Sequence, residues 1–145
     1  MANVYMTTAS GSASLDVLQQ AAYDIRNGAS GGSFTPRMDT GWGDKGFTRY
    51  IVSIENVAVI DLDSANRQAL VTALFDAVIG ARHESRDTPG VFAGYWVDDR
   101  KVYIDINRSF DSREEAMTVA AKRGELAIYD TWEDMEIRTE LTIAS

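Results

Sequence analysis

The sequence contains no cysteine, a single histidine and only two prolines. Without cysteine there can be no disulfide and no thiolate ligand for a metal, which agrees with a reducing compartment. Because His83 is the sole histidine, a zinc site would need carboxylates, and any histidine-dependent catalytic triad would have to use this one residue. His83 follows a helical segment in a polar stretch beside Glu84, and we assign it to the surface.

Long apolar runs and the usual enzyme motifs are also missing. No stretch approaches the about 18 apolar residues that a membrane helix needs, and Met1 to Gly11 lacks the basic start and apolar middle of a secretory signal. There is no Gly-x-Ser-x-Gly and no Gly-Lys-Ser/Thr, which excludes a hydrolase elbow and a P-loop. We expect a protein of the cytoplasm that binds no membrane and needs no cofactor.

Basic residues are in the minority. The chain has 14 lysines and arginines against 22 acids, a formal charge of -8. The last segment is the most acidic, because Arg138 alone opposes Glu125, Asp130, Glu133, Asp134, Glu136 and Glu140. Direct binding of DNA or RNA is therefore not expected, since phosphate contacts need a basic surface. The acids could face a basic partner, or they could simply keep the protein soluble.

The clearest structural signals lie between Val91 and Arg138. Val91 to Asp98 and Val102 to Asn107 alternate between apolar and polar residues, which predicts a hairpin turning at Asp98-Asp99-Arg100. Asp111 and Glu114 then form a capping box for a helix that Gly124 ends. Short β-prone runs at Leu126 to Tyr129 and Met135 to Thr139 follow.

The first half of the chain holds further elements. Met1 to Gly11 is either an arm or a short strand at Asn3 to Met6. A helix capped by Ser12 or Ser14 runs to about Asn27.

A second set of strands and a helix is expected from Phe47 onward. Phe47 to Glu55 alternates as a strand, Asn56 predicts a turn, and Val57 to Leu62 is the return strand. Asp63 or Ser64 caps a helix that ends near Gly80.

Two segments therefore share the order strand, strand, helix: Phe47 to Ile79 and Val91 to Arg123. Two such hairpins can join into one sheet. The sequence predicts a single α+β domain over residues 1–145, with an antiparallel sheet built from two ββα units and helices packed on one face.

Between Gly28 and Gly46 we expect a long glycine-rich loop, because no periodicity predicts a helix or strand there. Gly41 to Gly46 matches G-x-G-x-x-G, but it precedes a strand instead of following one, so it does not indicate a nucleotide site. Trp42 lies among glycines, which have no side chains that could bury its ring. We assign Trp42, Arg37 and Lys45 to a partner-binding surface, together with Glu133 and Asp134 of the acidic segment.

We assign the other two tryptophans and three tyrosines to packing in the core or on strand faces, not to binding: Trp96, Trp132, Tyr95, Tyr103 and Tyr129. Asp61 and Asp63 share one strand face and Asp105 occupies the matching place in the second half, so these three could hold a hard cation such as Mg²⁺. Asp63 serves equally well as a helix cap.

Several short strings together resemble a known group of proteins: Gly94-Tyr95-Trp96-Val97-Asp98, Val102-Tyr103-Ile104-Asp105, Arg113-Glu114-Glu115-Ala116, Arg123 to Asp130 and Glu136 to Thr139, with Gly32 to Pro36 and Gly46 to Ile54 upstream. This pattern resembles small uncharacterised proteins encoded by bacteriophages and some actinobacteria. The resemblance implies a phage or mobile-element setting and contributes no site residues.

Three functions follow as hypotheses. The first is a non-enzymatic phage or mobile-element accessory protein that binds a host protein in the host cytoplasm, with inhibition as one outcome of that binding. The second is a small Mg²⁺-dependent enzyme or nucleotide-binding sensor that uses Asp61, Asp63 and Asp105. The third is a virion or assembly component that works as a homo-oligomer.

Overall fold

The computed structural model describes residues 3–8, 10–35, 49–88, 90–125 and 127–139. The elements within this part of the chain are β1 (Asn3–Met6), α1 (Leu15–Arg26), β2 (Gly31–Thr35), β3 (Tyr50–Asp61), α2 (Arg67–Glu84), β4 (Val91–Asp98), β5 (Lys101–Phe110), α3 (Arg113–Lys122), β6 (Ala127–Asp130) and β7 (Met135–Arg138).

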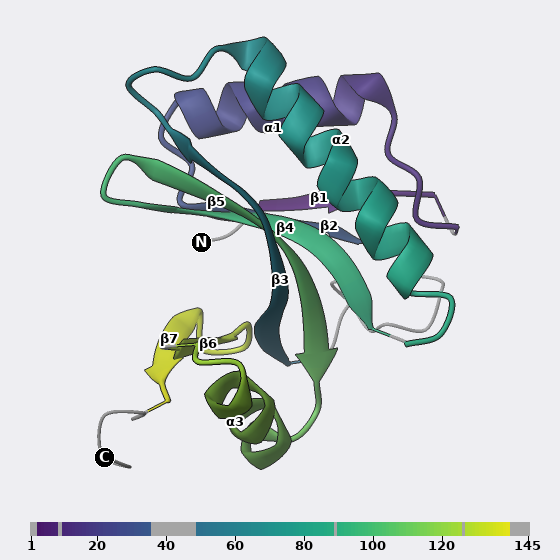
Figure 1. Ribbon diagram of the computed structural model, residues 1–145, viewed down its shortest axis with the longest axis vertical. Coiled ribbons are helices and arrows are strands. Elements are labelled where there is room, and N and C mark those ends of the chain that lie inside the picture. The colour runs from purple at the N-terminus through teal and green to yellow at the C-terminus, as the bar shows by residue number, and fades with distance from the viewer. Residues whose placement is uncertain (1–2, 9, 36–48, 89, 126, 140–145) are drawn as a thin grey trace.

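All seven strands belong to one mixed sheet in the order β1-β2-β4-β5-β3-β6-β7. β1 and β2 run parallel, and the other neighbouring strands are antiparallel. The sheet curls into a half-barrel, with α1 and α2 covering one end and α3 beside the other (Figure 1). Within the described residues, no helix has the length and apolar character needed to cross a membrane.

The expected sheet of two antiparallel ββα units is wrong, and β3 is the first reason. Asn56, expected to be a turn, lies inside one continuous strand from Tyr50 to Asp61. The Asn56 amide donates to Asp105 Oδ1 at 2.8 Å and, at 3.4 Å, to the carbonyl of Ala58. A residue that favours turns in isolation is thus held in a strand by its neighbour on β5.

The second reason is β2, which occupies Gly31–Thr35 inside the stretch expected to be a loop. It pairs in parallel with β1 and in antiparallel fashion with β4, and all five of its residues are buried. A strand covered on both faces needs no alternation of polar and apolar residues. Its sequence therefore carries no period-two signal, and its parallel pairing makes the sheet mixed.

Other local predictions are confirmed. The hairpin of β4 and β5 turns at Asp99 and Arg100, which have φ values of 49° and 63°. Ser14 caps α1, and Gly124 follows α3 with a φ of 75°. Asn3–Met6 is a strand.

Helix boundaries differ in detail from the predicted ones. The cap of α3 is Ser112, one residue after the expected Asp111. The cap of α2 is Asn66, and this helix continues through Gly80 to Glu84. Gly80 lies inside the helix and faces β5 closely, where a Cβ would lie 2.8 Å from Ile106 Cδ1.

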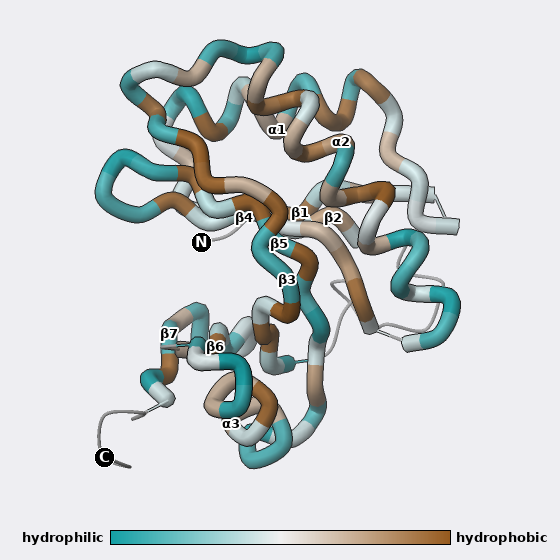
Figure 2. Tube along the Cα trace, in the orientation of Figure 1, coloured by the Kyte–Doolittle hydropathy of each residue, from teal (hydrophilic) through white to brown (hydrophobic). Residues whose placement is uncertain are grey.

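The side chains between α1, α2 and the sheet form the main core. α2 contributes most of one wall through Leu70, Leu74, Ala77 and Val78, all nearly inaccessible to water. β5 supplies the opposite wall with alternate residues Val102, Ile104 and Ile106. Figure 2 shows the hydrophobic segments of these elements facing one another.

A second, smaller core lies at the far end of β3 and β5. It consists of Tyr50, Val52, Phe110, Ala116, Ala120 and Ile128, from β3, β5, α3 and β6. β3 and β5 are the elements that enter both cores. At about 40 Å, a twelve-residue strand such as β3 is long enough to do so.

At the β1 end of the sheet, the backbone of Gly32 lies close to the rings of Tyr5 and Tyr95. The hydroxyls of Tyr5 and Tyr95 lie 2.7 Å apart, and Tyr5 also donates to Asp24 Oδ2 of α1 at 2.8 Å. A Cβ on Gly32 would overlap the ring of Tyr95 and lie 2.6 Å from Tyr5 Cε2. The two buried rings thus occupy the space that a side chain at position 32 would need.

We expect Gly32→Ala to lower the free energy of unfolding by about 1–3 kcal/mol, the usual effect of overpacking, because neither hydrogen-bonded ring can move aside. Gly80→Ala is the matched control. Its added methyl meets only the terminal carbon of Ile106, and alanine gains about 1 kcal/mol of helix propensity over glycine. Urea unfolding measures both variants, and equal destabilisation by the two changes would contradict the argument.

Candidate functional site

The side of the half-barrel that faces away from the helices is called the inner face here. On β5, Val102, Ile104 and Ile106 point into the main core, so the residues between them point to the inner face. Strand pairing extends this row sideways, because Trp96 of β4 lies opposite Tyr103 and Asn56 of β3 lies opposite Asp105. The residues of the inner face that matter below are Asn56, Trp96, Tyr103, Asp105, Asn107 and Tyr129.

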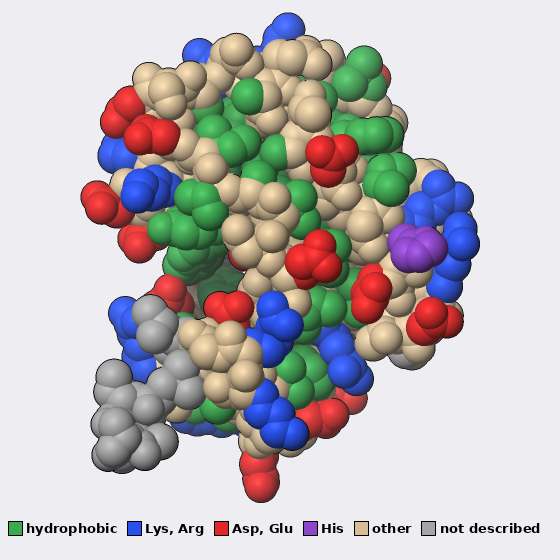
Figure 3. Space-filling view, viewed as in Figure 1, with side chains coloured by type: hydrophobic (Ala, Val, Ile, Leu, Met, Phe, Trp, Pro, Cys, Tyr) green, Lys and Arg blue, Asp and Glu red, His purple; other side chains and the backbone are tan. Residues whose placement is uncertain are grey.

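The inner face is concave. Two strands, β5 and β3, separate β4 from β6, so in a flat sheet these two strands would lie about 14 Å apart. Yet the ring centroids of Trp96 on β4 and Tyr129 on β6 are 6.5 Å apart. Figure 3 shows a hollow between the body that carries α1 and α2 and the lobe that carries α3, β6 and β7, with hydrophobic and acidic side chains around it.

Asp105 lies on the floor of this concave face. Burial raises the pKa of the Asp105 carboxyl, and repulsion from Glu125 raises it further, against hydrogen bonds from Asn56 and Ser53 that favour the charged form. The donors that reach Asp105 in the described part of the chain are neutral. A carboxylate that loses water without gaining a cation is disfavoured in the folded protein.

The turn between β6 and β7, residues 131–134, forms one rim of the hollow. Tyr129 donates from its hydroxyl to Asp134 Oδ1, which ties the turn to the inner face. Burial and the neighbouring carboxylate of Asp134 both raise the pKa of Tyr129, so this hydroxyl stays protonated and remains a donor. The backbone of Asp134 has a φ of 52°, a left-handed conformation that aspartate tolerates in turns.

Arg49 and Asp130 hold the base of this rim turn. The guanidinium donates from Nε to Oδ1 at 2.9 Å and from Nη2 to Oδ2 at 2.8 Å, and the carboxylate is almost fully buried. Asp130 also accepts the N–H groups of Trp132 and Glu133 at 3.0 and 3.3 Å. The hydrogen bonds from Arg49, more than those from the backbone, lower the pKa of Asp130.

Trp132 is the most exposed large hydrophobic side chain in the described part of the chain, at 73% of its full accessible surface. The Arg49 guanidinium carbon lies 4.6 Å from the centre of its ring and 4.9 Å from that of Tyr50. Cation–π contact therefore orients the indole without covering it. The packing role expected for Trp132 is wrong.

The residues predicted to bind a partner fall into two groups. Arg37, Trp42 and Lys45 lie outside the described residues. Glu133 and Asp134 lie together in the rim turn beside Trp132, and both are exposed.

The three acids predicted to hold a metal are not brought together. Asp61 accepts the N–H of Asp63 at 2.8 Å, and Asp63 pairs with Arg100 at 2.6 Å. Asp61 lies opposite Lys101, four residues and about 13 Å along β5 from Asp105. Across residues 3–8, 10–35, 49–88, 90–125 and 127–139, no three His, Asp or Glu side chains are arranged to hold a metal ion.

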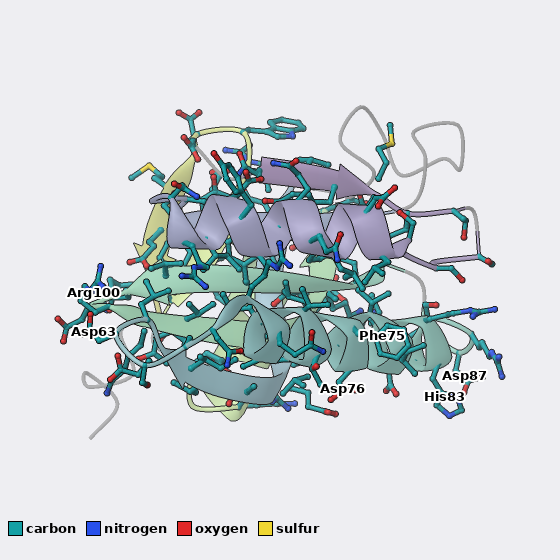
Figure 4. All side chains as sticks on the ribbon, turned by 90° about the horizontal axis from the view of Figure 1, so that it is seen from above. Asp63, Phe75, Asp76, His83, Asp87 and Arg100 are labelled. Carbon is teal, nitrogen blue, oxygen red and sulfur yellow. The ribbon has the colours of Figure 1, made fainter. Side chains whose placement is uncertain are left out.

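His83 does not complete a site with these acids either. Figure 4 shows Asp63 beside Arg100 at one end of the molecule, whereas His83 and Asp87 lie near the C-terminal end of α2 at the opposite end. His83 is exposed in the last turn of that helix, as expected for a surface residue.

Sequence reasoning missed the pairs Arg49–Asp130 and Trp96–Tyr129. Their members are 81 and 33 positions apart, so nothing in the local pattern joins them. A local signal did exist for Trp132, which stands among Asp130, Glu133 and Asp134. Such a polar setting is unusual for a buried tryptophan.

No protein-family model matches this chain, and neither a curated protein nor a solved structure shows significant similarity to it. The inner face and the rim turn combine half-exposed rings, a carboxylate whose pKa is raised by burial, and an oriented tryptophan.

We expect Asp105→Asn to raise the free energy of unfolding at neutral pH. A raised folded-state pKa means that the native state holds its proton longer than the unfolded chain, so stability falls as pH rises from the ordinary aspartate pKa through the raised one. Asparagine removes the charge and still offers an oxygen to Asn56.

Urea unfolding between pH 3 and pH 8 measures this effect, with Asp61→Asn as the control at an exposed position. The advantage of Asp105→Asn should appear as pH rises and vanish under acidic conditions. An Asp105→Asn variant that is less stable than the wild type at neutral pH would contradict the assignment.

Proposed function

We propose that this protein is a non-enzymatic binding protein that docks a basic surface of a partner protein against its rim turn and inner face. The observation that carries the proposal is Trp132, which is 73% exposed and yet oriented by Arg49. Exposed, pre-oriented tryptophans are typical anchors of protein interfaces, because a large apolar area is buried there at little cost in conformational entropy.

Charge supports the choice of a basic partner. The rim turn places Glu133 and Asp134 next to Trp132, and Glu136 follows on β7 with an exposed side chain. A chain with a formal charge of -8 attracts a basic protein at long range and repels nucleic acid. The acids of the rim then align the partner around the tryptophan.

The partner we propose is a protein of the host cell, met in its cytoplasm. This part of the proposal follows from the resemblance to phage and mobile-element proteins and from the absence of cysteine. The Mg²⁺-dependent alternative is not carried forward, because Asp61 and Asp63 engage each other and Arg100 instead of meeting Asp105.

Trp132→Ala is expected to weaken partner binding by about 30-fold, the effect of removing an anchor worth about 2 kcal/mol. The fold should be little affected, because most of the indole surface is already in water. Affinity capture from host lysate identifies the partner, and titration calorimetry then compares wild type and variant.

Phe75→Ala provides the matched control. Phe75 is another large hydrophobic side chain, 48% exposed, but it lies on α2, away from the rim turn (Figure 4). The proposal requires a captured protein that Phe75→Ala retains and Trp132→Ala loses. Equal retention by both variants, or equal loss, would refute a role for the rim turn.

A further inference from the structure

The ring pair Trp96–Tyr129 spans strand levels on either side of Asp105. Trp96 lies opposite Tyr103 on β5, and Tyr129 lies opposite Ile51, which in turn lies opposite Ser109. Asp105 is between positions 103 and 109 on the same strand and the same face. The two rings, whose centroids are 6.5 Å apart, therefore come from strand levels on either side of Asp105 and its neighbour Asn107.

Beside Asp105, the backbone of β4 comes close to the side chains of β5. The residue opposite Asp105 on that strand is Gly94, which has no side chain. A Cβ at Gly94 would lie 2.6 Å from Asn107 Nδ2 and 2.8 Å from the carbonyl oxygen of Gly32. The glycine lets the Asn107 amide lie beside Asp105, so the floor presents one carboxylate among neutral amides.

The charges around Asp105 are unbalanced. Glu125 acts on it as a second negative charge. Arg123 is a nearby described cation, but its Nε donates at 3.1 Å to the carbonyl oxygen of Ser53, and it forms no ion pair with Asp105. The inner face thus combines negative potential with two aromatic rings that are each partly exposed.

We propose that the inner face is a binding site for an arginine side chain of the partner, with the guanidinium stacked against Trp96 and Tyr129 and paired with Asp105. This rests on the proposed function and specifies what the basic partner inserts. A planar guanidinium suits both features, because it stacks on aromatic faces and donates two parallel hydrogen bonds to a carboxylate. It would also supply a positive charge, whereas the donors that reach Asp105 from the described residues are neutral.

The raised pKa of Asp105 means that its charged form is disfavoured in the folded protein, which a binding role explains better than a structural one. An asparagine at position 105 could accept the same hydrogen bond from Asn56 without the cost of a desolvated charge. The carboxylate is useful where a cation arrives from outside. Binding sites commonly contain charges that cost stability in the free protein.

The test uses a small molecule, so it does not depend on finding the partner. N-acetyl-arginine methylamide is titrated into the full-length protein, and the indole N–H resonance of Trp96, assigned by its loss in Trp96→Phe, is followed by NMR. We expect a saturable shift with a Kd in the millimolar range, as for one stacked and paired side chain.

Asp105→Asn should weaken this binding about tenfold, whereas the exposed control Asp61→Asn should leave it unchanged. Binding to the wild type should strengthen as pH rises and Asp105 ionises, and Asp105→Asn should lose this pH dependence. N-acetyl-lysine methylamide should bind more weakly, because an ammonium does not stack.

Three results would overturn the arginine site: no shift of Trp96, an equal shift in Asp105→Asn, or tighter binding of the lysine analogue. Trp132→Ala separates the two proposals. If Trp132→Ala still binds the arginine compound and also captures every protein that the wild type captures, the role of the rim turn is refuted and the arginine site stands. If Trp132→Ala loses the partner while Asp105→Asn binds the compound like wild type, the arginine site alone fails.

Discussion

The long pairing of β3 with β5 is the constraint on which the rest of the structure depends. Its register shifts twice, between Ser53 and Glu55 and between Asn56 and Ala58. Each shift adds a residue to β3 alone, and such bulges bend a strand and increase its twist. The curl brings Trp96 and Tyr129 together, makes the inner face concave, and lets one pair of strands take part in both the main and the smaller core.

Two carboxylates illustrate how the same residue type serves opposite purposes on this sheet. Asp130 is buried against Arg49 and two backbone N–H groups, so its charge is compensated and its pKa is lowered. Asp105 has neutral donors and a nearby acid, so its pKa is raised. The first carboxylate orders the rim turn, and the second is the group that we propose to pair with a cation of the partner.

The recognition surface that we propose is therefore built in two layers. Trp132, Glu133 and Asp134 form an exposed rim that a partner meets first, and Tyr129 connects this rim to the inner face through its hydrogen bond to Asp134. The concave sheet behind it carries Asp105 and the ring pair Trp96–Tyr129, which we propose to receive a single arginine side chain. Aromatic anchors and acids in this arrangement are the components on which the proposed binding role rests.

Local sequence determined the β4–β5 hairpin, the Ser14 cap of α1, the presence of α3, the acidic segment and the exposure of Glu133 and Asp134, because each depends on residues a few positions apart. Only the tertiary structure decided that Asn56 continues a strand, that Gly31–Thr35 joins the sheet beside β1, and that Trp132 stays in water over Arg49. It also decided that Asp105 lies between the strand levels of Trp96 and Tyr129 instead of beside Asp61 and Asp63. Strand pairing and sheet curvature join residues that are distant in the chain, and no periodicity within a short window carries that information.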